Sequence, residues 1–217
     1  MAQRRILHDE FFKKAKAEGY LARSAYKLKE IQERHRLLRA GMSVVDLGCA
    51  PGSWLQVASE TVGKKGFVVG IDLQEVRDRM PPNVRTIRGD IFKTDATALL
   101  PEPEAKFDVV LSDMAPNTSG HGDDALSVRL CRRVLELLPS LLAPGGGCAM
   151  KVLEGSGYPE LLRDCQKLFA KAKGLKPKAS RDASREIFIV CEGYKAPAAP
   201  VQQPAPGHKP APGWSRP

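Results

Sequence analysis

A lysine ends one of the most apolar segments of this chain. Lys151 directly follows Cys148, Ala149 and Met150, and a turn of three glycines precedes the segment. Burying an ammonium group is unfavourable by several kcal/mol unless the group is paired or loses its proton. Lys151 is therefore a candidate for proton transfer, with a structural ion pair or a side chain that extends to solvent as the alternatives.

Four other apolar segments end in an aspartate, namely Asp46, Asp72, Asp90 and Asp113. A single aspartate in such a position most simply begins a loop or caps a helix. In an open α/β sheet, however, the carboxyl ends of the strands meet at the edge where ligands bind. Four aspartates in series therefore predict one carboxylate-rich site.

The loop after the first of these segments reads DLGCAPGSW. Gly48 and Gly52 permit a tight turn and a close approach of backbone to ligand, just before a helix N-terminus. The spacing differs from GxGxxG, so a nicotinamide-dependent dehydrogenase is disfavoured. Asp46 suits a ligand with a cationic part. We expect S-adenosylmethionine, with Asp72 on its ribose, Asp90 on the adenine side and the Asp46 loop on the methionine part.

Short apolar runs alternate with helical patterns between residues 41 and 195, which predicts an α/β fold with a doubly wound, Rossmann-like parallel sheet covered on both faces. We expect strands at residues 43–47, 66–72, 84–90, 107–113, 147–153 and 185–192. We expect helices at residues 54–62, 95–100, 125–138 and 158–172. The last strand follows a basic Gly/Pro-containing segment and could enter antiparallel.

Two further segments flank this domain of residues 41–195. Residues 1–40 form a basic, largely helical arm that we count as part of the catalytic domain, with Ser24 as the N-cap of its second helix. Residues 196–217 are rich in Pro and Ala and contain few bulky apolar side chains. Such a composition cannot offset the entropy of ordering, so we predict a disordered tail.

The charge of the chain favours an anionic partner. Its 217 residues carry a formal net charge of +9. Eleven Lys and Arg stand against five Asp and Glu in residues 1–40, and seven against two in residues 166–186. The five cysteines lack zinc-site spacing and are expected to be reduced core thiols. No membrane span or signal peptide is evident, and reduced cysteines favour a cytoplasmic protein. Because the cysteines lack the spacing of a zinc site, we also expect no metal.

Several motifs together resemble the RrmJ/FtsJ-type RNA 2′-O-ribose methyltransferases. They are GYLARSAYKLKEI, DLGCAPGSW, the IDL at Asp72, GDIF, SDMAPN, MKVLEG and SREIFIV, in family-like order over roughly residues 10–194. The resemblance implies a methyltransferase fold with a mostly parallel seven-stranded sheet. It also implies cofactor contacts at Gly52, Trp54, Asp72, Asp90 and Asp113. Ser53 departs from the family pattern, which usually has a second glycine there, and we expect only a small adjustment of the loop.

The same resemblance implies a catalytic tetrad of Lys27, Asp113, Lys151 and Glu186. A ribose 2′-hydroxyl is a weak nucleophile, so methyl transfer needs alignment and a base, whereas no metal is required. We expect Lys151 to take the proton, Asp113 to orient it, and Lys27 and Glu186 to position the ribose. Burial and a second cation favour neutral Lys151, whereas the two carboxylates favour its charged form. Taken singly, Lys27 and Glu186 would be ordinary surface charges.

We expect RNA to be held through its phosphates by basic side chains. The candidates are Lys13, Lys14, Arg23, Arg181 and Arg185. For a monomeric, single-domain member, the resemblance points to large-subunit (23S-type) ribosomal RNA, at a uridine of the peptidyl-transferase region. A tRNA anticodon-loop ribose methyltransferase is the close alternative. A non-catalytic RNA-binding assembly factor is the other, and an altered tetrad would have supported it.

Overall fold

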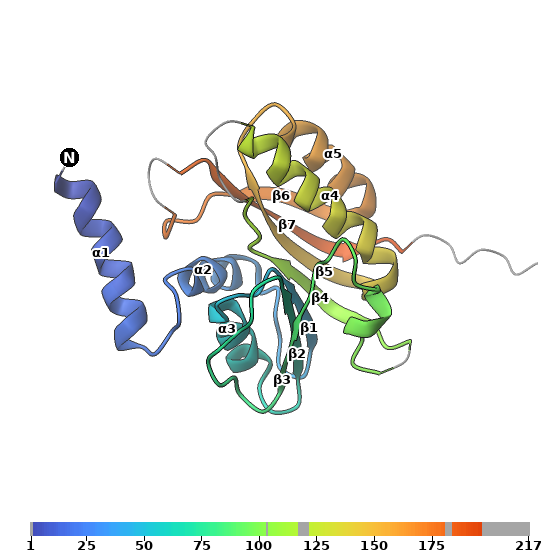
Figure 1. The fold of residues 1–217 in the computed structure, drawn as a ribbon. Helices are drawn as coiled ribbons and strands as arrows, with labels where there is room; N and C mark the ends of the chain where they lie inside the picture. The colour runs from blue at the N-terminus through green and yellow to red at the C-terminus, as the bar shows by residue number, and fades with distance from the viewer. Residues whose placement is uncertain (1, 103, 117–121, 181–183, 197–217) are drawn as a thin grey trace, which may run out of the picture.

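A seven-stranded sheet forms the centre of the protein (Figure 1). The structure is a computed structural model and describes residues 2–102, 104–116, 122–180 and 184–196. The strand order is β3-β2-β1-β4-β5-β7-β6, and β7 runs antiparallel to both of its neighbours. The predicted α/β fold and the antiparallel entry of the last strand are confirmed.

The strands follow the apolar runs closely in the first half of the chain. Their bounds are β1 (Ser43–Leu47), β2 (Phe67–Asp72), β3 (Val84–Arg88), β4 (Phe107–Ser112), β5 (Leu142–Leu153), β6 (Phe169–Leu175) and β7 (Glu186–Tyr194). The interiors of β1, β2, β4 and β5 are buried because helices cover both faces of the sheet.

The helices divide between the two faces. Their bounds are α1 (Ala2–Ala17), α2 (Ala25–His35), α3 (Ser53–Val62), α4 (Asp123–Leu141) and α5 (Tyr158–Leu168), with a short 3₁₀ helix η1 (Ala96–Leu99). In Figure 1, α4 and α5 cover one face, α2 and α3 lie on the other, and α1 extends away from the sheet. No helix in the described part of the chain is long and apolar enough to cross a membrane.

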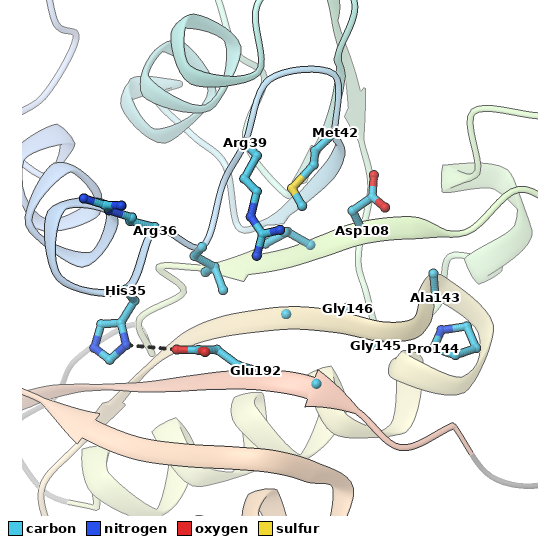
Figure 2. Close-up of a pocket in the computed structure, with 14 residues that line it drawn as sticks. His35, Arg36, Arg39, Met42, Asp108, Ala143, Pro144, Gly145, Gly146 and Glu192 are labelled. Carbon is cyan, nitrogen blue, oxygen red and sulfur yellow. Dashed lines mark hydrogen bonds and ion pairs between the residues drawn. The ribbon is translucent and has the colours of Figure 1, made fainter.

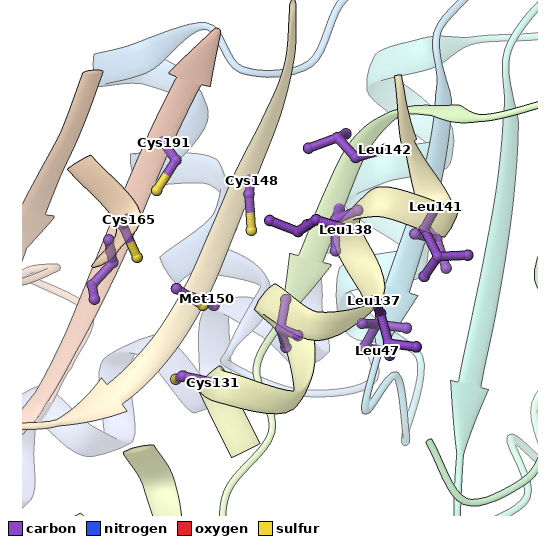
Figure 3. Close-up of a cluster of buried hydrophobic side chains, with 14 of the residues drawn as sticks. Leu47, Cys131, Leu137, Leu138, Leu141, Leu142, Cys148, Met150, Cys165 and Cys191 are labelled. Carbon is purple, nitrogen blue, oxygen red and sulfur yellow. The ribbon is translucent and has the colours of Figure 1, made fainter. Parts of the chain in front are cut away.

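The larger apolar core lies between the sheet and helices α4 and α5. In Figure 3, Leu138 of α4 lies next to Cys148 of β5, and Leu137 lies next to Leu47 of β1. Cys131, Cys165 and Cys191 lie in the same cluster, and all five cysteines are buried and free. Burial raises the pKa of the Cys131 thiol to about 12, so the thiols behave as small apolar side chains.

One predicted helix is too long. The pattern of residues 158–172 suggested a single helix, but α5 ends at Leu168 and residues 169–175 form the edge strand β6. Phe169 pairs with Tyr194 and Leu175 with Phe188 of β7. The antiparallel pairing to β7 decides the conformation, since Ala and Lys in this segment have good intrinsic helix propensity.

Ser24 is the N-cap residue of α2, as predicted, but it does not cap the helix through its side chain. Ser24 occupies the position before the helix, but its backbone is helical and its hydroxyl makes no capping bond. The Ser24 hydroxyl instead lies 2.8 Å from that of Ser53 at the start of α3. Residues 197–217, most of the predicted tail, are outside the described residues.

Candidate active site

Asp46, Asp72, Asp90 and Asp113 all lie at the carboxyl edge of the parallel strands. β1 lies between β2 and β4, with Asp46 in register with Gly70 and Leu111. Asp72 ends β2, whereas Asp90 and Asp113 lie just beyond β3 and β4. The order of the strands therefore gathers residues that are spread over nearly seventy positions of sequence.

Lys27, Asp113, Lys151 and Glu186 meet at this same edge. Lys151 Nζ lies 2.9 Å from Asp113 Oδ1 and donates a hydrogen bond to the Asp113 carbonyl oxygen at 2.8 Å. Lys27 Nζ donates to Glu186 Oε2 at 2.9 Å. The cross pairs are longer, with Lys27 Nζ 4.0 Å from Asp113 Oδ1 and Lys151 Nζ 3.9 Å from Glu186 Oε1. Two amines and two carboxylates thus alternate in one compact cluster.

The cluster is shielded from water but not closed to it. The side chains of Lys27 and Lys151 are 7% and 6% exposed, and those of Asp113 and Glu186 are 17% and 20% exposed. Burial acts to raise the pKa of Glu186, but Lys27, Lys151 and the Ser184 hydroxyl outweigh it, so the pKa is lowered. Glu186 is therefore ionised at neutral pH and balances the charge of a lysine.

The position of Lys27 depends on the start of α3. Trp54 Nε1 donates to the Ser24 carbonyl oxygen at 2.9 Å, and the Leu21 amide donates to the Gln56 side chain at 2.9 Å. The Trp54 ring also lies 5.6 Å from the ring of Phe188, and Lys27 Nζ lies 5.7 Å from the Phe188 centroid. Because α3 directly follows the loop at residues 48–52, this packing ties Lys27 to that loop.

A cavity of about 450 Å³ opens beside the cluster. Its lining residues lie at or just after the carboxyl ends of β1, β2, β3 and β4, and one residue comes from α4. They are Gly48, Ala50, residues 71–74, residues 89–92, residues 113–116 and Leu130. Ligand pockets typically have this size and combine apolar walls with a few placed polar groups. Asp113 lines the cavity and also contacts Lys151, so the cavity and the cluster form one site.

Gly48 shapes the wall of this cavity. Its backbone has a φ of +85°, and a Cβ at this position would lie 2.2 Å from Met114 Cγ. Asp72 holds the loop in place, since Asp72 Oδ2 accepts from the Ala50 amide at 3.0 Å and Asp72 Oδ1 from the Gln74 amide at 2.8 Å. Asp90 Oδ1 accepts from the Phe92 amide at 2.9 Å. Each carboxylate oxygen retains a lone pair for a ligand hydroxyl or amine.

Three predicted cofactor residues do not line the cavity. Asp46 is fully buried, and neither carboxylate oxygen has a hydrogen-bond partner among the described residues. Burial, with Asp113 and Asp72 nearby, raises the pKa of Asp46 well above its ordinary value. Gly52 lies directly before α3 with a φ of +117°, and Trp54 is buried against Phe188. Their direct contact with a cofactor stays a prediction.

The predicted RNA-binding residues are scattered around the arm and β7. Lys13, Lys14 and Arg185 are exposed, and Arg23 is half-buried. Lys14 pairs with Glu18 and lies over the Tyr26 ring. Arg181 lies outside the described residues. The sequence did not predict that Ser24, Gln56 and Phe188 hold Lys27 in place. Serine, glutamine and phenylalanine are common residue types, and no motif connected these three to Lys27.

A second cavity lies at the amino ends of the parallel strands β4 and β5, opposite the carboxyl edge (Figure 2). It is lined by the end of α2, the first residues of β4 and β5, and the end of β7. Arg39 points into it above Gly146, and His35 Nδ1 lies 3.3 Å from Glu192 Oε1. None of the residues predicted for catalysis or cofactor binding lines this cavity.

The strand order and the carboxylate-lined cavity at the carboxyl edge define the class, a Rossmann-like methyltransferase. The chain belongs to the FtsJ-like methyltransferase family, whose model matches residues 20–194. This confirms the family resemblance and the assignment as an enzyme.

Relatives and one solved structure agree with this assignment. The chain is 46% identical over 197 residues to the ribosomal RNA large subunit methyltransferase E of Halorubrum lacusprofundi, covering 89% of this chain and 72% of the relative. It is 45% identical to the protein of the same name from Syntrophobacter fumaroxidans, covering 85% and 94%. The crystal structure of a putative ribosomal RNA methyltransferase from Plasmodium falciparum superposes with a TM-score of 0.72 at 29% identity, over 82% of this chain and 100% of that one.

Proposed function

We propose that this protein methylates the 2′-hydroxyl of a ribose, in a uridine of large-subunit (23S-type) ribosomal RNA, with S-adenosylmethionine as methyl donor. One observation carries the proposal: Asp113 lines the cavity and lies 2.9 Å from Lys151 Nζ. A methyl donor in the cavity and a ribose at the tetrad would therefore meet at Asp113. The names of the relatives favour ribosomal RNA over the tRNA alternative.

The cavity suits S-adenosylmethionine in size and in chemistry. Asp72 and Asp90 lie at adjacent strand ends and present carboxylate oxygens that can accept from ribose hydroxyls and from the adenine side. Ile91, Met114 and Leu130 supply apolar wall. When bound, the sulfonium supplies an electrophilic methyl group, so the protein has only to align the hydroxyl and accept its proton.

Lys151 is the base in this proposal. Its Nζ is held by both the side chain and the carbonyl of Asp113, which fixes the direction of its lone pair when the amine is neutral. Lys27 Nζ lies 4.0 Å from Asp113 Oδ1, so a second amine lies close to the carboxylate that Lys151 contacts. Ionised Glu186 binds Lys27 and leaves Asp113 to orient Lys151. Glu186 and Lys27 then position the ribose at the mouth of the cluster.

The test compares Lys151→Ala and Lys151→Arg with Lys65→Ala, a control at an exposed lysine in the α3–β2 loop. Methyl transfer from labelled S-adenosylmethionine is measured on unmethylated large subunits, naked ribosomal RNA and tRNA. We expect kcat to fall at least about 10²-fold in both Lys151 variants, because arginine keeps its proton and cannot act as a base. Cofactor affinity measured by calorimetry should be unchanged. Turnover near that of the unmodified protein in Lys151→Ala would refute the assignment.

A further inference from the structure

Lysines follow one another along the free edge of the sheet. Lys171 and Lys173 are exposed on the edge strand β6, and Lys176 and Lys178 are exposed in the segment that follows it. Their side-chain amines form no hydrogen bond or ion pair within the described part of the chain. We call these four residues the lysine row. Within the described part of the chain, their positive charges are therefore not neutralised by a direct contact.

The lysine row leads toward the active site. The register of β6 on β7 places Lys171 opposite Glu192 and Leu175 opposite Phe188. Phe188 is two positions from Glu186 of the tetrad, so the row begins far from the tetrad and approaches it. At about 3.4 Å per residue, Lys171 and Leu175 lie about 14 Å apart along the strand. This length is enough to contact more than one phosphate of an RNA strand.

The first half of the row lies on the side of the sheet that α2 covers. Leu175, Phe188 and Val190 pack in the same cluster as Leu28 of α2. Side chains two positions apart share a face of a strand, so Lys171 and Lys173 project to the side of Leu175. This is also the side of Lys27, which α2 contributes to the tetrad.

The second half of the row is fixed against the arm. The Lys178 amide donates to Glu30 Oε2 at 2.7 Å, and Ala179 packs in one cluster with Ala15 and Tyr26. The buried Pro177 and Ala179 alternate with the exposed Lys176 and Lys178. The backbone is thus held while the amines remain available to a ligand.

We propose that the lysine row binds consecutive phosphates of the ribosomal RNA strand that enters the active site. This inference rests on the proposed function. Lysines at a sheet edge also prevent edge-to-edge pairing of sheets, and that role alone would explain exposed charge on β6. It does not explain why the row continues past the strand into a segment fixed against α2, the helix that carries Lys27. Phosphate contacts would set the register of the RNA without reading its sequence.

The experiment compares Lys171→Glu/Lys173→Glu with Lys64→Glu/Lys65→Glu. Both double variants change the net charge equally. Lys64 and Lys65 are exposed in the loop before β2, which is separated from β6 by four strands of the sheet. Glutamate keeps a charge on β6, so edge protection is retained, which size-exclusion chromatography checks. Binding of unmethylated large-subunit ribosomal RNA is measured over a series of salt concentrations, together with kcat and KM for methyl transfer.

For the β6 variant we expect affinity about tenfold weaker or more, and a salt slope shallower by about 1.4, which is about 0.7 for each lost phosphate contact. KM should rise while kcat at saturating RNA changes little, because the tetrad is intact. Equal losses in both double variants, or no loss in either, would overturn the lysine row while the unmodified protein still methylates RNA. Absence of RNA methylation by the unmodified protein would overturn both proposals.

Discussion

Lys27 Nζ and Glu186 Oε2 lie 2.9 Å apart, although 159 positions separate the two residues in the sequence. The contact joins the second helix of the arm to the first residue of the last strand. It is one of the two short ion pairs of the tetrad, the other joining Lys151 to Asp113.

The ion pair at Glu186 should make stability depend on acid pH. The pKa of Glu186 is lowered from its ordinary 4.5, so its contribution is complete above about pH 4.5 and is lost as the pH falls through the folded-state value. We expect Glu186→Gln to be about 1 to 2 kcal/mol less stable at neutral pH. The difference should shrink on acidification. Denaturant unfolding at a series of pH values measures it, and a difference that does not change with pH would contradict the assignment.

Asp46→Asn should stabilise the protein at neutral pH. The folded-state pKa of Asp46 is raised well above 3.8, so the folded protein holds a proton that the unfolded chain releases. Stability is therefore lost as the pH rises from about 3.8 toward the folded-state value. Asparagine removes this loss and keeps the shape of the side chain. Thermal unfolding should show a higher Tm than the unmodified protein at neutral pH and little difference below about pH 3.8. A lower Tm at neutral pH would show that Asp46 is ionised and paired.

Trp54→Phe should reduce turnover more than cofactor affinity. The variant keeps a ring next to Phe188 but loses the hydrogen bond from Nε1 to the Ser24 carbonyl, which costs about 1 kcal/mol of stability. Lys27 is then held less firmly against Glu186. We expect kcat to fall several-fold, with S-adenosylmethionine affinity nearly unchanged by calorimetry. Loss of affinity with full turnover would instead indicate a direct cofactor contact by Trp54.

Gly48→Ala should weaken cofactor binding through a clash, and Gly145→Ala is its matched control. The two glycines have nearly the same backbone, with φ of +85° and +79°. Alanine at either position costs about 1–2 kcal/mol of backbone strain. A Cβ at Gly48 would also displace Met114 in the cavity wall, whereas a Cβ at Gly145 meets nothing within 4 Å. Calorimetry should show lower cofactor affinity for the Gly48 variant alone. Equal affinity in the two variants would exclude Met114 from the binding wall.

The sequence predicted β1, β2 and β4 well because their pattern is local. Near-continuous apolar runs such as residues 43–47 mark strands buried on both faces, and an aspartate or a turn ends each of them. The family motifs likewise named the residues that meet at the carboxyl edge. Residue type and short-range spacing carry this information directly.

The sequence did not predict β6 or the contact that the Ser24 hydroxyl makes with Ser53. Residues 169–172 have good helix formers and continue the pattern of α5, so only the pairing with β7 makes them a strand. Ser24 has the right type and position for a cap, yet its hydroxyl lies against Ser53. In both cases a partner distant in sequence decides between two locally acceptable conformations.

The sequence by itself therefore determined the α/β class, the family and the participants of the site, including Lys151 at its strand end. The tertiary structure decided which carboxylate each lysine contacts, which residues support Lys27, and that Asp113 belongs to both the cavity and the tetrad. Periodicity and motif spacing report on local conformation and burial. Distances between side chains on different strands depend on the order and register of the whole sheet, which no short segment encodes.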